Sequence, residues 1–142
     1  KLGRWYNMST LNVTNAQITT LKDASGGNSS TPANILAGTV KAWVTFDGSA
    51  GTISPAASFN VDSLTDNGNG DYTVNIDTDF SSANWCATGL CDAASTAWGG
   101  MSFDASAAKA AGTVRVQCWD DVKNSSGHLN PAVVDVMCIG VQ

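Results

Sequence analysis

Apolar and polar residues alternate along much of the chain after residue 39. Segment 39–47, TVKAWVTFD, places two Val residues, an Ala and a Phe on one face, and polar residues with one Trp on the other. The same period of two recurs near 112–120 and 132–141. This period is that of half-buried β-strands. The residues expected to point inward are Val40, Ala42, Val44, Phe46, Val114, Val116, Cys118, Val134, Val136 and Cys138.

The composition favours strands and turns over helices. Only 13% of the 142 residues are charged, and Ser, Thr, Asn, Gly and Ala are abundant where helical proteins have Glu, Lys and Leu. We therefore expect an all-β fold class: an antiparallel β-sandwich or small jelly roll, preceded by an extended stem or linker and a short helix. The expected strands span 39–47, 57–66, 70–77, 84–89, 96–103, 112–120 and 132–141.

The stretch DNGNGD at 66–71 indicates a turn and not a calcium loop. An EF-hand loop needs oxygen-bearing side chains at its third and fifth positions, where this stretch has Gly68 and Gly70. Asn-Gly between alternating segments instead predicts a tight β-hairpin. A tip at Asn67–Gly68 matches apolar residues across the hairpin best, so we expect that register. It pairs Phe59 with Ile76, Val61 with Val74 and Ser63 with Tyr72.

Residues 1–31 show little core signal, and their Gly-, Ser- and Asn-rich end predicts a stem or linker segment. Thr31 and Pro32 predict a helix start, with Thr31 as the N-cap, and Gly38 predicts the helix end. We therefore expect a stem or linker at 1–31 and a β-sandwich domain at 32–142. Because the chain begins with Lys1 and not Met, we expect a fragment or a processed product.

The cysteines are Cys86, Cys91, Cys118 and Cys138, and they allow three interpretations. Cys118 and Cys138 share strand faces with valines, which indicates buried free thiols that act as small core residues. A disulfide between Cys86 and Cys91, or another pairing, is the second interpretation. A zinc site is the third, but the spacing is unusual for zinc ligands, and we predict no metal.

Charge and hydropathy argue against two classes of partner. The net charge is −5 and no cluster of Lys and Arg is present, so we expect no nucleic-acid partner. No apolar run approaches the roughly 20 residues of a membrane-spanning helix, so we expect no membrane insertion. We also expect no cofactor.

Two tryptophans occupy the non-core face of their strands: Trp43, beside Lys41, and Trp119. Large apolar side chains left in water usually mark an interface. We therefore expect Lys41, Trp43 and Trp119 at an oligomer interface, where a homo-oligomer would bury them. The alternative is that a loop or a second sheet of the same chain covers both indoles.

Segment 81–108 departs from the strand pattern, because it is rich in Ala, Ser and Gly yet holds two Trp residues. Aromatic faces stack on sugar rings, Asn and Asp supply hydrogen bonds, and loops on a rigid scaffold often carry binding sites. The predicted receptor-binding residues are therefore Trp85, Trp98, Asn84 and Asp92. The alternative places both Trp side chains in the core, where burying a large aromatic contributes a few kcal/mol.

Six short motifs stand between residues 20 and 78: Thr31–Pro32, Lys41–Val44, Phe46–Gly48, Ser58–Val61, Asp66–Gly68 and Asp71–Val74. Together they resemble a module found repeatedly in bacteriophage virion proteins, especially those of marine phages. The last strands fit that family only loosely, and 81–108 has no match in it. The resemblance implies a tail-fibre or other virion appendage, elongated and homotrimeric, with a globular β-tip after a thin stem. It brings no catalytic residues.

The function implied by the resemblance is non-enzymatic: a tail-fibre or appendage tip that attaches the virion to the host surface. The expected partners are further copies of the chain in a homotrimer, other virion proteins, and a host surface glycan or protein. The expected location is the virion, assembled in the bacterial cytoplasm. A capsid-decorating, head-fibre or collar protein without receptor binding is one alternative, and a secreted, monomeric carbohydrate-binding module is another. The acidic pair Asp77 and Asp79 lies at a solvated strand end and no GxSxG motif is present, so we expect no enzyme.

Overall fold

The computed structural model describes residues 17–23, 25–92, 98–107, 109–122 and 125–142. The chain divides into two compact units, Lys1–Ile35 and Leu36–Gln142. The boundary falls inside the short helix, a few residues later than the boundary predicted after residue 31. Among the residues that the structure describes, no helix has the length and apolar character needed to cross a membrane.

The described part of the first unit contains a small hairpin. Strands β1 (Leu21–Lys22) and β2 (Ser29–Ser30) pair antiparallel. The carboxylate of Asp23 accepts hydrogen bonds from the backbone N–H of Gly27 at 3.0 Å and from the side chain of Asn28 at 2.6 Å. The Gly-, Ser- and Asn-rich stretch predicted to be only a linker is therefore an ordered turn, because one aspartate satisfies its backbone donors.

Helix α1 (Pro32–Gly38) begins and ends where the sequence predicted. The Thr31 hydroxyl accepts a hydrogen bond from the Asn34 N–H at 3.2 Å, which is the N-cap contact. Pro32 occupies the first helical position, where its missing N–H is not needed. No residue of α1 is buried.

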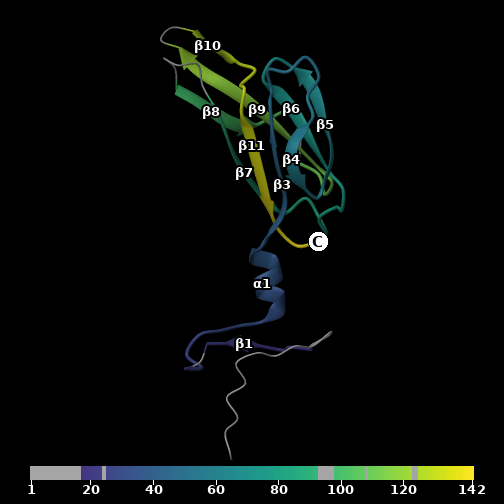
Figure 1. Ribbon diagram of the computed structural model, residues 1–142, viewed down its shortest axis with the longest axis vertical. Helices are drawn as coiled ribbons and strands as arrows, with labels where there is room; N and C mark the ends of the chain where they lie inside the picture. Colours follow the sequence, from purple (N-terminus) through teal and green to yellow (C-terminus); the bar gives the residue numbers. More distant parts are fainter. Residues whose placement is uncertain (1–16, 24, 93–97, 108, 123–124) are drawn as a thin grey trace, which may run out of the picture. The chain divides into compact units, whose positions relative to one another are not determined.

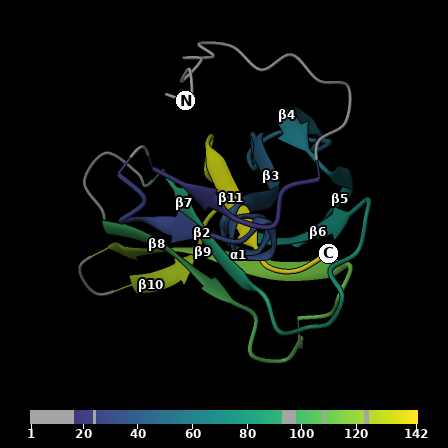
Figure 2. The ribbon, with the colours of Figure 1, turned by 90° about the horizontal axis from the view of Figure 1, so that it is seen from below.

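The second unit is an antiparallel β-sandwich, which confirms the predicted fold class. One sheet has the order β4-β3-β11-β7; the other has the order β10-β9-β6-β5, with β8 also paired to β9. Figure 1 shows the strands along their length, and Figure 2 shows the two sheets as separate layers. The strands are β3 (Val40–Phe46), β4 (Pro55–Phe59), β5 (Val61–Gly68), β6 (Asp71–Ile76), β7 (Cys86–Cys91), β8 (Trp98–Phe103), β9 (Thr113–Val122), β10 (Ser125–His128) and β11 (Val134–Ile139).

The core lies between the two sheets and is built from the predicted alternating positions. Of the ten residues predicted to point inward, nine are buried and Val40 is exposed. Val40 is the first residue of its strand. Phe46 packs edge-on against Tyr72 with ring centroids 5.2 Å apart. The buried residues that complete the core are Val74, Ile76, Phe80 and Trp85.

Residues 57–66 do not form one strand as predicted, because the chain crosses between the sheets at Asn60. Its φ of 54° is in the left-handed region, which few residues other than Gly and Asn adopt readily. The Asn60 amide donates to Lys41 O at 3.0 Å and to Thr78 O at 3.1 Å, and its Oδ1 accepts from Thr78 N–H at 2.8 Å. One side chain therefore joins β3, the β4–β5 corner and the end of β6.

We expect Asn60→Ala to destabilise the sandwich by about 2 kcal/mol, because it removes these bonds and puts a Cβ-bearing residue without a polar side chain at positive φ. Asn60→Gly should lower the free energy of unfolding by only about 1 kcal/mol, because glycine adopts this backbone conformation readily. Urea unfolding followed by Trp fluorescence measures both. Asn84→Ala, at an exposed position, is the control and should change stability little. Equal stability of the alanine variant and the wild type would contradict the role of Asn60.

Strands β5 and β6 form the predicted hairpin, but its tip is Asn69–Gly70 and not Asn67–Gly68, so the predicted register is wrong. At the tip, Gly68 lies opposite Asp71. Gly70 has a φ of 66°, and a Cβ there would lie only 2.5 Å from Leu129 O and 2.6 Å from Cys118 O. The turn forms at the second Asn-Gly because three backbone segments approach closely at residue 70, where only glycine fits.

With its tip at Asn69–Gly70, a regular hairpin would place apolar residues of β6 opposite polar residues of β5. Two β-bulges in β5 restore the pairing of apolar with apolar residues. The register shifts between Asp66 and Gly68 and again between Val61 and Ser63. As a result Val61 lies opposite Ile76, and Leu64 lies opposite Val74. Apolar residues do face each other, as the pairing argument required, but extra residues in one strand achieve it.

Candidate functional site

The outer face of the β4-β3-β11-β7 sheet carries a row of exposed apolar side chains. Phe59, Trp43 and Met137 lie opposite one another across β4, β3 and β11. Their exposed fractions are 55%, 39% and 39%, and Leu90 on β7 is 76% exposed. Leu90 stands two residues from Thr88, which pairs with Met137, so it is on the same face. We call Phe59, Trp43, Met137 and Leu90 the apolar face.

The apolar face includes an open groove of about 550 Å³ between Trp43, Met137 and Leu90. Two of the other lining residues on this face are threonines and one is Asp135. Large apolar side chains, an aromatic and a methionine with little charge between them are the composition of the centre of a protein interface. An apolar patch of this kind is uncommon on a monomer unless a partner covers it.

The outer face of the other sheet is polar instead. The amide of Asn75 donates to Ser63 Oγ at 3.1 Å and to Thr65 Oγ1 at 3.2 Å. The amide of Asn67 donates to Thr73 Oγ1 at 2.9 Å. These cross-strand bonds link β5 to β6 along their solvent side. We call this surface the polar face.

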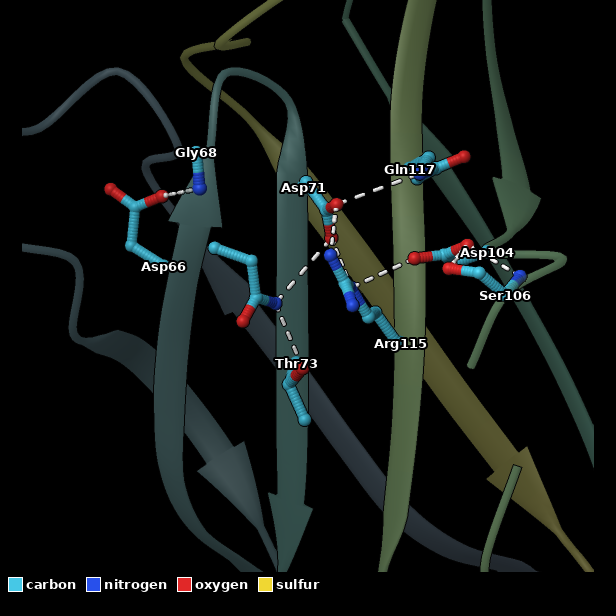
Figure 3. A network of polar contacts seen from close by, with 9 residues as sticks. Asp66, Gly68, Asp71, Thr73, Asp104, Ser106, Arg115 and Gln117 are labelled. Atoms are coloured by element: carbon cyan, nitrogen blue, oxygen red, sulfur yellow. Dashed lines mark hydrogen bonds and ion pairs between the residues drawn. The ribbon is translucent and has the colours of Figure 1, made fainter. Parts of the chain in front are cut away.

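An arginine between two aspartates is the strongest feature of the polar face (Figure 3). Arg115 on β9 donates two hydrogen bonds to Asp71 on β6, from Nε at 2.7 Å and from Nη2 at 2.6 Å. Its Nε also lies 3.0 Å from Asp104 Oδ2. Asp104 follows β8 and accepts a hydrogen bond from the Ser106 N–H at 2.7 Å. Two parallel hydrogen bonds make the Arg115–Asp71 ion pair a strong one. Together with Asp104, the pair links β6, β9 and the end of β8.

The network keeps its carboxylates ionised. The hydrogen bonds from Arg115 lower the pKa of Asp71, and those from Ser106 lower the pKa of Asp104. Asp71 conversely raises the pKa of the Arg115 guanidinium. Both carboxyl groups are mostly buried and Arg115 is about one-third exposed. This arrangement stabilises the sheet, and it opposes the raised pKa that a catalytic proton donor needs.

We expect the sandwich to lose stability in acid because of this network. The folded-state pKa of Asp71 is below its usual value of 3.8, so its contribution is present above about pH 4 and is lost as pH falls through the folded-state value. Asp71→Asn should reduce stability at neutral pH and flatten the pH dependence below about pH 5. Denaturant titrations at several pH values measure this. Asp62→Asn, an exposed position on β5, controls for net charge; identical acid profiles for wild type and Asp71→Asn would contradict the assignment.

Trp43 and Trp119, predicted to share an oligomer interface with Lys41, lie on opposite faces of the sandwich. Trp43 is on the apolar face, where Lys41 is partly buried beside it along β3. Trp119 is on the outer face of β9, 38% exposed. A Cβ at Gly100 would lie 2.4 Å from Trp119 Cζ2, so the indole rests on the backbone of β8. The two indoles therefore belong to separate surfaces, and a single flat interface cannot bury both.

The structure does not assemble the predicted receptor site of Trp85, Trp98, Asn84 and Asp92. Trp85 is only 3% exposed and stacks on Phe80 with ring centroids 4.4 Å apart, so it is a core residue and not a receptor contact. Asn84 precedes β7 and Asp92 follows it, so they are exposed at opposite ends of that strand. The backbone of Trp98 pairs with Asp121, while its side chain lies outside the described residues.

The predicted turn and thiol states can be compared with the structure directly. Asp66 Oδ1 accepts the Gly68 N–H at 2.9 Å, and Asp71 is bound to Arg115, so 66–71 is a turn whose carboxylates already have partners. Within the described ranges, no group of three or more His, Cys, Asp and Glu side chains could hold a metal.

All four cysteines are free, and Cys118 and Cys138 are buried as predicted.

Two features of these surfaces were missed by sequence reasoning. Phe59 was predicted to face Ile76 inside a hairpin, whereas it lies beside Trp43 on the apolar face. The pairing of Asp71 with Arg115 joins residues 44 positions apart. The sequence does show residues of opposite charge at outward-facing strand positions. These residues can be paired only when the order of the strands in the sheet is known.

Comparison of the chain with protein-family models finds no match. Neither a curated protein nor a solved structure matches it.

Proposed function

We propose that this chain is a non-enzymatic structural protein of a bacteriophage virion: a tail-fibre or appendage module that assembles as a homotrimer and attaches the virion to its host. The virion assignment comes from the resemblance of residues 20–78 to phage virion modules. Self-association is supported separately, by the surface chemistry of the sandwich.

The observation that carries the proposal is the apolar face. Phe59, Trp43 and Met137 form a continuous row across three strands, and each is more than one-third exposed in a single chain. Burying such side chains contributes roughly 25 cal/mol per Å² of apolar surface, which favours association with a second apolar surface. Symmetric assembly of identical chains supplies such a surface without a further protein.

Helix α1 gives a second reason to expect a neighbouring chain. It has seven residues and none is buried, and its Ile35 and Leu36 are exposed. A helix of this length is not stable unless it packs against something. Contact between copies of the chain would supply that packing.

The polar face supports a structural role over a catalytic one. Asp71 and Asp104 flank one arginine, and the pKa of each is lowered. A glycosidase of the usual kind needs one carboxylic acid that remains protonated near neutral pH. This acidic pair is thus suited to joining strands.

The experiment that tests the proposal locates the chain on a particle and measures cell attachment. Antibodies against the purified chain are applied to phage particles in which mass spectrometry detects it, and labelled positions are recorded by electron microscopy. The purified chain, fluorescently labelled, is then mixed with the bacterial host of those particles. Label at the tail or appendage together with saturable binding to host cells is the expected result.

Three other results would overturn the proposal. Label on the capsid without cell binding would favour a decorating protein. A monomeric chain that binds polysaccharide would favour a carbohydrate-binding module. Release of reducing ends from host polysaccharide would show an enzyme. Light scattering during gel filtration adds the mass, expected at about 44 kDa for three chains of 14.6 kDa.

A further inference from the structure

Two cysteines from different sheets meet inside the sandwich. Cys91 ends β7 of one sheet, and Cys118 lies in the middle of β9 of the other. Cys118 is fully buried, and Cys91 is partly buried. Both side chains point inward, because Cys91 alternates with the exposed Leu90 and Cys118 alternates with Trp119.

The hydrogen bond of the Cys91 thiol places its side chain near Cys118. The Cys91 thiol donates to Gly100 O at 3.2 Å. Gly100 lies opposite Trp119, and the next pair in that ladder is Met101 with Cys118. Besides burial, which is the larger cause, each of the two thiols shifts the pKa of the other, as expected for side chains that lie close together. The two cysteines are therefore close to each other across the gap between the sheets.

The remaining cysteines have no comparable arrangement. Cys86 starts β7 and is exposed; at about 3.3 Å per residue it lies roughly 16 Å from Cys91, too far for the Cys86–Cys91 disulfide of the second interpretation. Cys138 is buried on β11, where it lies opposite Ala87. Cys86 and Cys138 thus serve as an exposed and a buried reference for the pair.

We propose that Cys91 and Cys118 are a cross-linking site, which joins the two sheets by a disulfide when the folded chain meets a small disulfide oxidant such as oxidised glutathione.

The chemistry proceeds by two thiol–disulfide exchanges. The Cys91 thiolate, on the more accessible sulfur, attacks one sulfur of oxidised glutathione, forming a mixed disulfide and releasing one glutathione thiolate. The Cys118 thiolate then attacks the Cys91 sulfur, forms the inter-sheet bond and releases the second glutathione. The protein loses two protons and two electrons, and the oxidant becomes two molecules of glutathione.

Burial makes both steps slow at neutral pH. It raises the pKa of the Cys91 thiol and, more strongly, that of Cys118. Only the thiolate attacks a disulfide, so the rate of cross-linking rises with pH in this range. The pair thus behaves as a structural bond that forms slowly, and not as a rapid redox catalyst.

The test uses the full chain carrying Cys86→Ser, so that the exposed thiol does not react. It is incubated with oxidised glutathione at about pH 9, then unfolded and alkylated, and its intact mass and thiol-linked peptides are measured. The expected product has lost two hydrogen atoms, contains a Cys91–Cys118 peptide pair, and alkylates only at Cys138. Its melting temperature should be higher by roughly 10 °C, because the bond closes a loop in the unfolded chain. A reducing agent should reverse both changes.

Adding Cys91→Ser to this background should abolish the mass change and the thermal shift. Cys138→Ala should retain both, which separates the pair from a general effect of losing a core thiol. Three free thiols after prolonged oxidation of the folded chain would overturn the proposal. So would a disulfide that includes Cys138, or a glutathione adduct on Cys91 that never resolves.

Discussion

Replacing Trp43 with Glu is expected to dissociate the proposed homotrimer into monomers. Trp43 is the centre of the apolar face, between Phe59 and Met137 in register. A carboxylate there must either stay hydrated, which keeps the surfaces apart, or be buried without a partner. Central aromatic residues of interfaces typically contribute 2 kcal/mol or more, so the dissociation constant should rise by at least roughly 30-fold. Light scattering at low micromolar concentrations measures the change.

Trp119→Glu is the matched control, because it makes the same change at an indole of similar exposure on the opposite face. It should leave the assembly intact. Circular dichroism and the melting temperature of each variant show whether the sandwich still folds. If both variants remain assembled, the apolar face is not the interface; if only Trp119→Glu dissociates, the interface is on the polar face.

Much of the sandwich is predictable because strand burial is a local property. Val114, Val116 and Cys118 alternate with polar residues, and this is sufficient to assign them to the core. The exchange of sheets at Asn60 is different, since nothing in the alternation of 57–66 marks it. The positive φ there depends on bonds to Lys41 and Thr78, which are distant in sequence.

The hairpin tip and the surfaces show the same limit. Choosing between the two Asn-Gly pairs required knowing that residue 70 approaches the backbone of Leu129 and Cys118. Likewise, the alternation of residues along the strand predicted that Trp43 points outward. That Phe59 and Met137 lie beside it depends on the strand order β4-β3-β11. Strand order is set by packing over the whole unit, so the sequence alone indicates single exposed residues and not the surface they form.

The second large effect is expected from Trp85→Ala, which should destabilise the sandwich by about 4 kcal/mol. The indole stacks on Phe80 with an interplanar angle of 11°, and its Nε1–H donates to Ala110 O at 2.9 Å. Lys109 Nζ lies over the ring, 4.5 Å from its centroid. Alanine would leave a cavity and an unpaired carbonyl, and Lys109 would lose the closer of its two aromatic contacts. Urea unfolding followed by circular dichroism measures the loss.

Two comparisons separate this core role from the receptor contact predicted for Trp85. Trp85→Phe keeps the aromatic stack but loses the hydrogen bond, so it should destabilise by about 1–2 kcal/mol. Trp119→Ala removes a half-exposed indole and should change stability less than Trp85→Ala does. A Trp85→Ala variant that is as stable as the wild type but unable to bind host cells would support the predicted role of Trp85 as a receptor contact. A destabilised variant whose folded fraction still binds cells would place recognition elsewhere on the surface.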